Sequence, residues 1–157
     1  MIINLTQHAA TPAQVDAGVV DLSESQRAEL SALLTVEEDV LRASKEAREG
    51  LYNARVSGII SLIWPVLARE DHARVAEAAR LYAEGDHLGG WNAARRPLFD
   101  ALVGGAPYLV DRLVARLKEL AVRPVYATTA RRSVETVLPD GSVRKTQVFD
   151  HIGFEDA

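Results

Sequence analysis

The chain has 157 residues, of which 48% are hydrophobic and 25% are charged, a composition typical of one soluble globular domain. Its 18 basic and 22 acidic residues give a formal net charge of −4, which argues against binding to long nucleic acid through charge alone. The chain has no cysteine, which excludes disulfides, thiolate metal ligands and a cysteine nucleophile, and fits the cytoplasmic location that we expect.

The first forty residues alternate between strand and helix patterns. Residues 1–6 and 19–22 are short β-prone runs, and Gly18 is placed to end a helix between them. A capping box, in which Ser or Thr is followed three residues later by Gln or Glu, marks the start of a helix. This pattern occurs at Thr11–Gln14, Ser23–Gln26 and Thr35–Glu38.

Residues 40–96 have a helical pattern without a strand, and we expect two helices there. This helical insertion would pack on the sheet or form a dimer interface. Its most apolar run, residues 59–67, is only half the ~20 residues of a membrane span, so we expect a core helix that Pro65 bends or ends and no membrane association. We expect residues 86–92 to form a loop in which Trp91 plugs the edge of the core.

A strand, a glycine turn, an amphipathic helix and a second strand follow one another over residues 99–129. In the turn, Gly104 and Gly105 allow a sharp change of direction, and Pro107 suits the first helical position. This βαβ unit predicts a parallel sheet. Residues 131–149 then read as a β-hairpin, with a short tail behind it.

We therefore predict a single α/β domain over residues 1–157: a small, Rossmann-like, mostly parallel sheet with helices on both faces, a helical insertion and a C-terminal β-hairpin. Loops that leave parallel strands meet at the carboxyl edge of the sheet, where open α/β folds bind ligands. His8, in the loop after the first strand, would there be a general acid or base or a phosphate donor. It is equally consistent with a histidine that only caps the strand exit.

Gly104 and Gly105 would expose backbone N–H groups to phosphate at the start of a helix, although a tight turn alone also needs two glycines. Arg131, after the second strand of the βαβ unit, suits phosphate through its fork of donors, although a hairpin arginine is more often solvated. The sequence is neither GxGxxG nor GxxxxGK[ST], and no histidine has metal-ligand spacing. We expect no metal and no cofactor.

The first loop and the glycine turn together resemble the CRISPR-associated Rossmann fold, or CARF-like, superfamily. In the first loop the matching residues are Thr6, Gln7, His8 and Thr11. In the turn they are Gly104, Gly105, Ala106 and Tyr108, with Ala106-Pro107 where the superfamily usually has Thr-Lys. The resemblance implies a homodimer whose pocket binds a cyclic oligoadenylate, and some small stand-alone members are ring nucleases that cleave it without metal.

By this resemblance the chain would bind a cyclic oligonucleotide second messenger of antiviral defence and cleave it, with His8 catalytic and Arg131 among the phosphate contacts. Two alternatives remain open. One is a non-catalytic nucleotide sponge or protein-interaction module that acts against such defence. The other is a small α/β enzyme for another phosphorylated metabolite.

Overall fold

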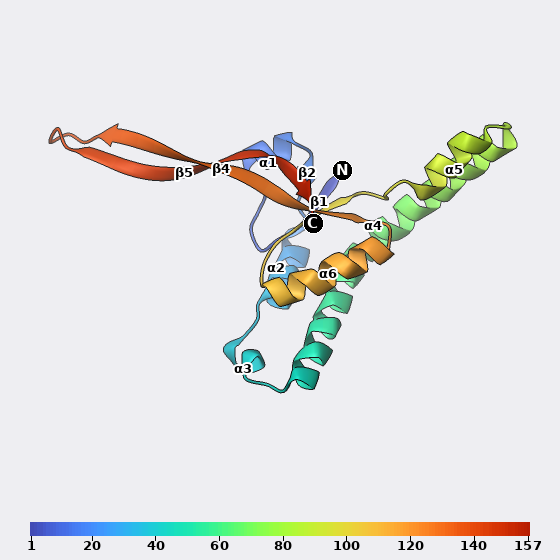
Figure 1. Cartoon of the computed structure of the whole chain (residues 1–157), viewed down its shortest axis with the longest axis horizontal. Coiled ribbons are helices and arrows are strands. Elements are labelled where there is room, and N and C mark those ends of the chain that lie inside the picture. Colours follow the sequence, from blue (N-terminus) through green and yellow to red (C-terminus); the bar gives the residue numbers. More distant parts are fainter.

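The computed structural model describes residues 1–157 and contains a five-stranded sheet with the strand order β2-β1-β3-β4-β5 (Figure 1). β1, β2, β3 and β4 are mutually parallel, and β5 pairs antiparallel with β4. The chain is therefore a mixed α/β protein with a mostly parallel sheet, as predicted. The strands are β1 (Ile2–Leu5), β2 (Val19–Val20), β3 (Asp100–Val103), β4 (Arg123–Val137) and β5 (Val143–Asp156).

The helices carry most of the chain between these strands. Two of the three capping boxes are formed as predicted, with Thr11 starting α1 and Ser23 starting α2. Thr35 instead ends α2, where its hydroxyl donates to the Ser31 carbonyl, and the next helix has no side-chain cap. The helices are α1 (Pro12–Asp16), α2 (Glu24–Leu34), α3 (Glu38–Leu41), α4 (Lys45–Ala83), α5 (His87–Arg95) and α6 (Pro107–Glu119).

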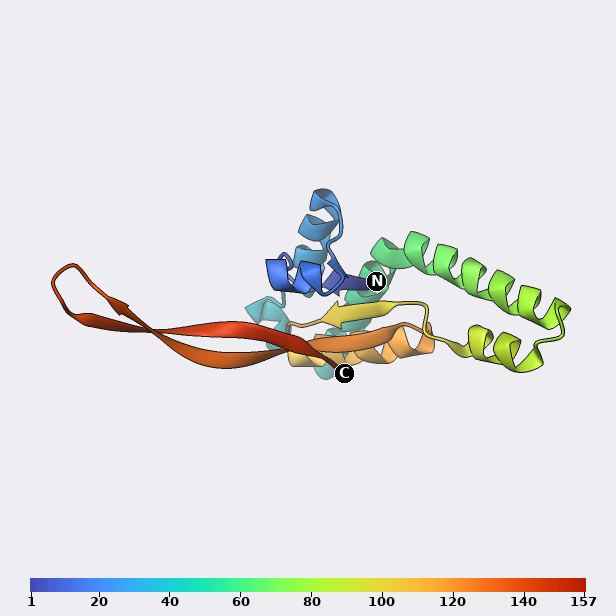
Figure 2. The same ribbon diagram turned by 90° about the horizontal axis from the view of Figure 1, so that it is seen from above.

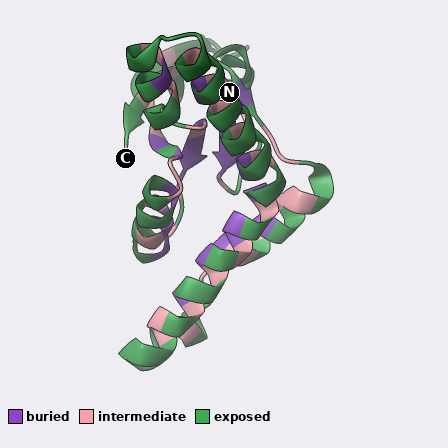
Figure 3. Cartoon of the chain, turned by 90° about the vertical axis from the view of Figure 1, so that its right-hand side faces the viewer, coloured by how far each residue is buried: buried purple, intermediate pink, exposed green.

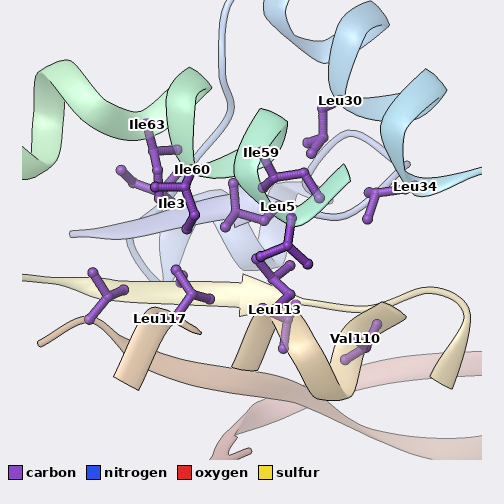
Figure 4. Close-up of a cluster of buried hydrophobic side chains, with 14 of the residues drawn as sticks. Ile3, Leu5, Leu30, Leu34, Ile59, Ile60, Ile63, Val110, Leu113 and Leu117 are labelled. Atoms are coloured by element: carbon purple, nitrogen blue, oxygen red, sulfur yellow. The ribbon is translucent and has the colours of Figure 1, made fainter. Parts of the chain in front are cut away.

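The hydrophobic core lies on one face of the sheet. Ile3 and Leu5 alternate with Asn4 along β1, so they point to the same face, where Ile59 and Ile63 of α4 pack on them together with α2 and α6 (Figure 4). α1 lies on the opposite side of the sheet and buries no residue (Figure 1). Helices thus lie on both faces of the sheet, as predicted, but one of the two faces is covered only by this five-residue helix.

The handedness of parallel crossovers explains this one-sided packing. The chain steps from β1 to β2 in one direction, and then to β3 and β4 in the other. Because right-handed crossovers in opposite directions place their helices on opposite faces, α1 is separated from α2, α4 and α6.

The predicted βαβ unit is present as β3, α6 and β4. Pro107 occupies the first turn of α6, whose apolar side chains, including Leu109, Leu113 and Leu117, are buried. The two strands are joined at their amino ends by Arg123, whose Nε and Nη2 donate to the Asp100 carboxylate at 2.9 and 2.6 Å. This pair fixes the register in which Leu102 lies opposite Val125.

The helical insertion differs from the prediction. α4 is one continuous 39-residue helix that does not end at Pro65, an exposed residue, and its axis bends along its length (Figure 1). Neighbouring turns are buried in the core through Ile63 and Leu67, so packing offsets the one backbone hydrogen bond that proline removes. α4 is by length and composition the one helix that could cross a membrane, a test that core helices of soluble proteins also pass.

The expected loop at residues 86–92 is a helix, α5, which runs back along the end of α4 (Figure 2). Asp86 caps it by accepting the Gly89 N–H at 2.9 Å. Gly90 lies so close to the Tyr82 ring that a Cβ would approach it to 2.9 Å. The two glycines therefore serve helix capping and close helix packing. Trp91 is 54% exposed and does not plug the core, and α5 and the end of α4 beside it are largely exposed to solvent (Figure 3).

The C-terminal hairpin is longer than predicted. Its pairing runs from Val125 opposite Asp156 to Val137 opposite Val143, so the supposed tail is part of β5. The turn has Gly141 at φ +83°. The ribbon projects from the sheet on the side opposite the α4–α5 pair (Figures 1 and 2).

Candidate functional site

The candidate site lies between the carboxyl ends of β1 and β3, where the order of the strands reverses. β1 leads to β2 on one side and is paired with β3 on the other, with Leu5 opposite Val103. Such a switch point leaves a crevice between the two outgoing loops. A pocket of about 430 Å³ occupies it, lined by Thr6, Gln7, His8, Ala9, Thr11, Gln14, Leu102, Val103, Gly104, Gly105, Tyr126 and Ala127.

Both loops of the pocket present unpaired backbone donors. Among the backbone hydrogen bonds outside regular helices and strands, none is donated by residues 7–9 or 104–106. Gly105 adopts a φ of +129°, which turns the chain sharply between β3 and α6. At α6, Ala106 is the N-cap residue and supplies no side-chain acceptor, Pro107 has no N–H, and the Leu109 N–H donates to the Ala106 carbonyl at 3.1 Å. Tyr108 is therefore the one residue of the first turn that keeps a free N–H. Two sets of amide donors thus flank one crevice.

A buried polar network holds the first loop in shape. Asn4 is 3% exposed, and its Nδ2 donates to the His8 carbonyl at 2.8 Å and to Asp21 Oδ1 at 2.7 Å. Its Oδ1 accepts from the amide and the hydroxyl of Thr6 at 3.0 and 2.7 Å. The Asp21 carboxylate in turn accepts the Ala10 N–H at 3.1 and 3.2 Å. Since each partner is satisfied, the network fixes the loop that carries His8.

No carboxylate, lysine or arginine lines this pocket, so the amides and His8 set its electrostatics. The His8 side chain is exposed and has no hydrogen-bond partner in the protein, although its carbonyl is held by Asn4. The imidazole is therefore free to donate or accept a proton at a bound ligand. Leu102 is 3% exposed and lies opposite Val125, so its side chain and that of Tyr126 lie on opposite faces of the sheet. Tyr126 is the one aromatic residue among those that line the pocket. No group of three or more His, Cys, Asp or Glu side chains is placed to hold a metal ion.

Six of the nine sequence-predicted site residues line the pocket: Thr6, Gln7, His8, Thr11, Gly104 and Gly105. Arg131 does not border it, contrary to expectation. β4 continues straight past the pocket, so Arg131 lies four residues, or about 13 Å, beyond Ala127. There its guanidinium stacks 5.4 Å from the Phe149 ring.

The other two predicted residues also lie outside this pocket. Ala106 is the N-cap of α6, and Tyr108 lines a separate cavity beside α4. The prediction also missed Asn4, Asp21 and Tyr126. A signal for Asn4 was present, because an amide inside the apolar strand Ile-Ile-Asn-Leu needs buried partners.

Comparisons with known proteins add one match. A family described as "Uncharacterized protein MJ1673 family" matches residues 1–155. No curated protein and no solved structure matches the chain. The family description names no ligand and no reaction.

Proposed function

We propose that this chain, which belongs to the MJ1673 family, binds a cyclic oligonucleotide of the cyclic oligoadenylate type. The family match covers residues 1–155, and the ligand would occupy the pocket between the ends of β1 and β3. In this proposal the sheet is a CARF-like variant of the Rossmann-like arrangement. The loop after β1 and the glycine turn after β3 are the two segments by which that superfamily holds its ligand, and both line the pocket here.

The observation that carries the proposal is the set of free amides at residues 7–9 and 104–105 around a pocket without a carboxylate. Backbone N–H groups beside a helix N-terminus favour a phosphate, which accepts several hydrogen bonds at once. Tyr126, the one aromatic residue among those that line the pocket, would offer its ring to a base. A pocket that suits both a phosphate and a base would suit a nucleotide.

Cleavage would use His8 without a metal. A ribose 2′-oxygen attacks the neighbouring phosphorus, the bond from phosphorus to the 5′-oxygen breaks, and a cyclic 2′,3′-phosphate forms. His8 takes the proton from the 2′-hydroxyl or gives one to the leaving 5′-oxygen. Gln7, Thr11 and the amides of Gly104 and Gly105 would hold the phosphate and stabilise its charge.

A homodimer follows from the size of such a ligand. A cyclic oligonucleotide carries several phosphates, whereas one chain offers one cluster of amides in about 430 Å³. Two copies related by a two-fold axis would present two such clusters to one ring.

Incubation of the protein with labelled cyclic oligoadenylates tests the proposal. His8→Ala should lower turnover roughly 10² to 10⁴-fold and leave binding nearly unchanged. His72→Ala, a histidine on α4 outside the pocket, is the matched control and should keep full turnover. Unchanged hydrolysis in His8→Ala removes the catalytic assignment, and a wild-type protein that binds no cyclic oligonucleotide removes the function.

The second candidate is binding without cleavage, as in a nucleotide sponge. It is favoured by one observation: no group orients the His8 imidazole, whereas catalytic histidines are usually held by a third residue. The same incubation separates the candidates, because a sponge retains the labelled ring intact.

A further inference from the structure

A second cavity, of about 300 Å³, lies between the start of α4 and the first turns of α6. Its walls are Lys45, Arg48, Glu49, Tyr52, Tyr108 and Arg112. It shares no lining residue with the switch-point pocket. Three cations and one carboxylate make it strongly positive, in contrast to the uncharged walls of the first pocket.

Two of these cations have no partner. Lys45 and Arg48 form no salt bridge and no side-chain hydrogen bond, although nine other basic residues of the chain do form salt bridges. Both lie in the first turns of α4, the positive end of the helix dipole, where a cation is unfavourable. An anion bound between them would offset this repulsion.

Arg112 is held in position beside them. Its Nη1 donates to the Tyr108 carbonyl at 2.9 Å, and its guanidinium lies 5.1 Å from the centre of the buried Tyr52 ring. The Glu49 carboxylate is 4.0 Å away, too far for a tight pair. The guanidinium is therefore oriented by its surroundings and keeps donors free for a ligand.

Tyr108 adds an aromatic surface. Tyr108 borders the cavity and is 67% exposed. An exposed aromatic ring beside positive charges offers a face on which a base can stack. The Glu49 carboxylate is suited to accept a hydrogen bond from a ribose hydroxyl.

We propose that this cavity is a second binding site, specific for a nucleoside phosphate. Lys45, Arg48 and Arg112 hold the phosphate, and Tyr108 stacks on the base. The site goes beyond the proposed function and does not depend on it, because it involves neither His8 nor the glycine turn.

The test is an NMR titration of the 15N-labelled protein with adenosine monophosphate. The amide resonances of Lys45, Arg48, Tyr108 and Arg112 should shift. The double variant Lys45→Gln/Arg48→Gln should weaken this binding at least about tenfold, as two lost charge-assisted contacts require. Arg42→Gln is the matched control, because this nearby exposed arginine is paired with Glu38 outside the cavity and should bind normally.

Two further probes separate the phosphate from the base. Inorganic phosphate should shift Lys45 and Arg48 more weakly than adenosine monophosphate, and Tyr108→Ala should reduce that difference. His8→Ala should change nothing here, so this site can survive a failure of the proposed function. An equal loss in Arg42→Gln, no shift at these residues, or shifts only at residues 6–11 and 104–106 would overturn the proposal.

Discussion

Gly105 is the residue on which the turn after β3 depends most directly. Its φ of +129° is rarely adopted by residues with a side chain, whereas a Cβ there would meet nothing closer than Val110 at 3.8 Å. We predict that Gly105→Ala lowers the free energy of unfolding by roughly 1–3 kcal/mol through backbone strain alone. Urea unfolding measures this change.

Gly104→Ala provides the control for that prediction. Gly104 has no positive φ, and an added Cβ would make an ordinary contact of 3.5 Å with Thr6. Its unfolding free energy should change by less than about 0.5 kcal/mol. Equal losses in the two variants would contradict the assignment of strain to Gly105.

Some residues of the candidate site could be predicted from the sequence, and the others could not for a physical reason. His8 and Gly104 were recognisable because each follows an apolar run that had to be a strand, and parallel strands bring such residues to one edge. Arg131 was misplaced because no local signal marks where a strand leaves its sheet. The partners Asn4 and Asp21 are 17 residues apart, and only the β1–β2 pairing brings them together.

Among the elements, the hairpin of β4 and β5 carries a pH-sensitive contact. Arg132 Nε and Nη2 donate to the Asp150 carboxylate at 2.8 and 3.3 Å, and this hydrogen bonding lowers the pKa of Asp150. A carboxyl whose pKa is lowered on folding stabilises the folded form above its ordinary pKa of about 3.9 and loses that contribution as the pH falls further.

We therefore predict that the paired fraction of the hairpin decreases as the pH falls from about 5 to about 2, while the core stays folded. The Hα chemical shifts of residues 131–149 report the paired fraction. Because the pair is exposed, the effect should be small and should shrink at high salt. Asp150→Asn should remove most of the pH dependence, and an unaltered profile in that variant would assign the fraying to other groups.

The elements differ in how well the sequence specified them. α6 and its flanking strands were predicted because its apolar residues recur at a strict helical period and proline and glycine mark its start. The sequence predicts a loop in place of α5 because the segment contains two adjacent glycines, which are weak helix formers. Contact with α4 overrides that preference, since only a glycine fits against Tyr82.

The whole molecule is a small core with two projections, which are the end of α4 with α5 and the hairpin, and these extend in opposite directions (Figure 2). Every member of the main hydrophobic cluster precedes Pro124 in the sequence, so the outer hairpin contributes nothing to it. We predict that replacing residues 134–146 by Asn-Gly, a two-residue hairpin turn, changes the free energy of unfolding by less than about 1 kcal/mol.

Thermal unfolding of the shortened chain measures this, with the full-length chain as reference. The pocket at β1 and β3 should also survive, since its last lining residue is Ala127. A collapse of stability would show that the hairpin supports the core.

The central position of β1 in the sheet has a consequence for folding during synthesis. β1 leaves the ribosome about a hundred residues before its partner β3. At the usual 5–20 residues per second, β1 waits on the order of 5–20 s with one edge unpaired. Ile3 and Leu5 remain uncovered for much of that time, because Ala101 and Val103 of their shared core have not been made. Translation therefore sets the earliest moment at which the sheet closes, and this interval is when the nascent chain most needs protection from aggregation.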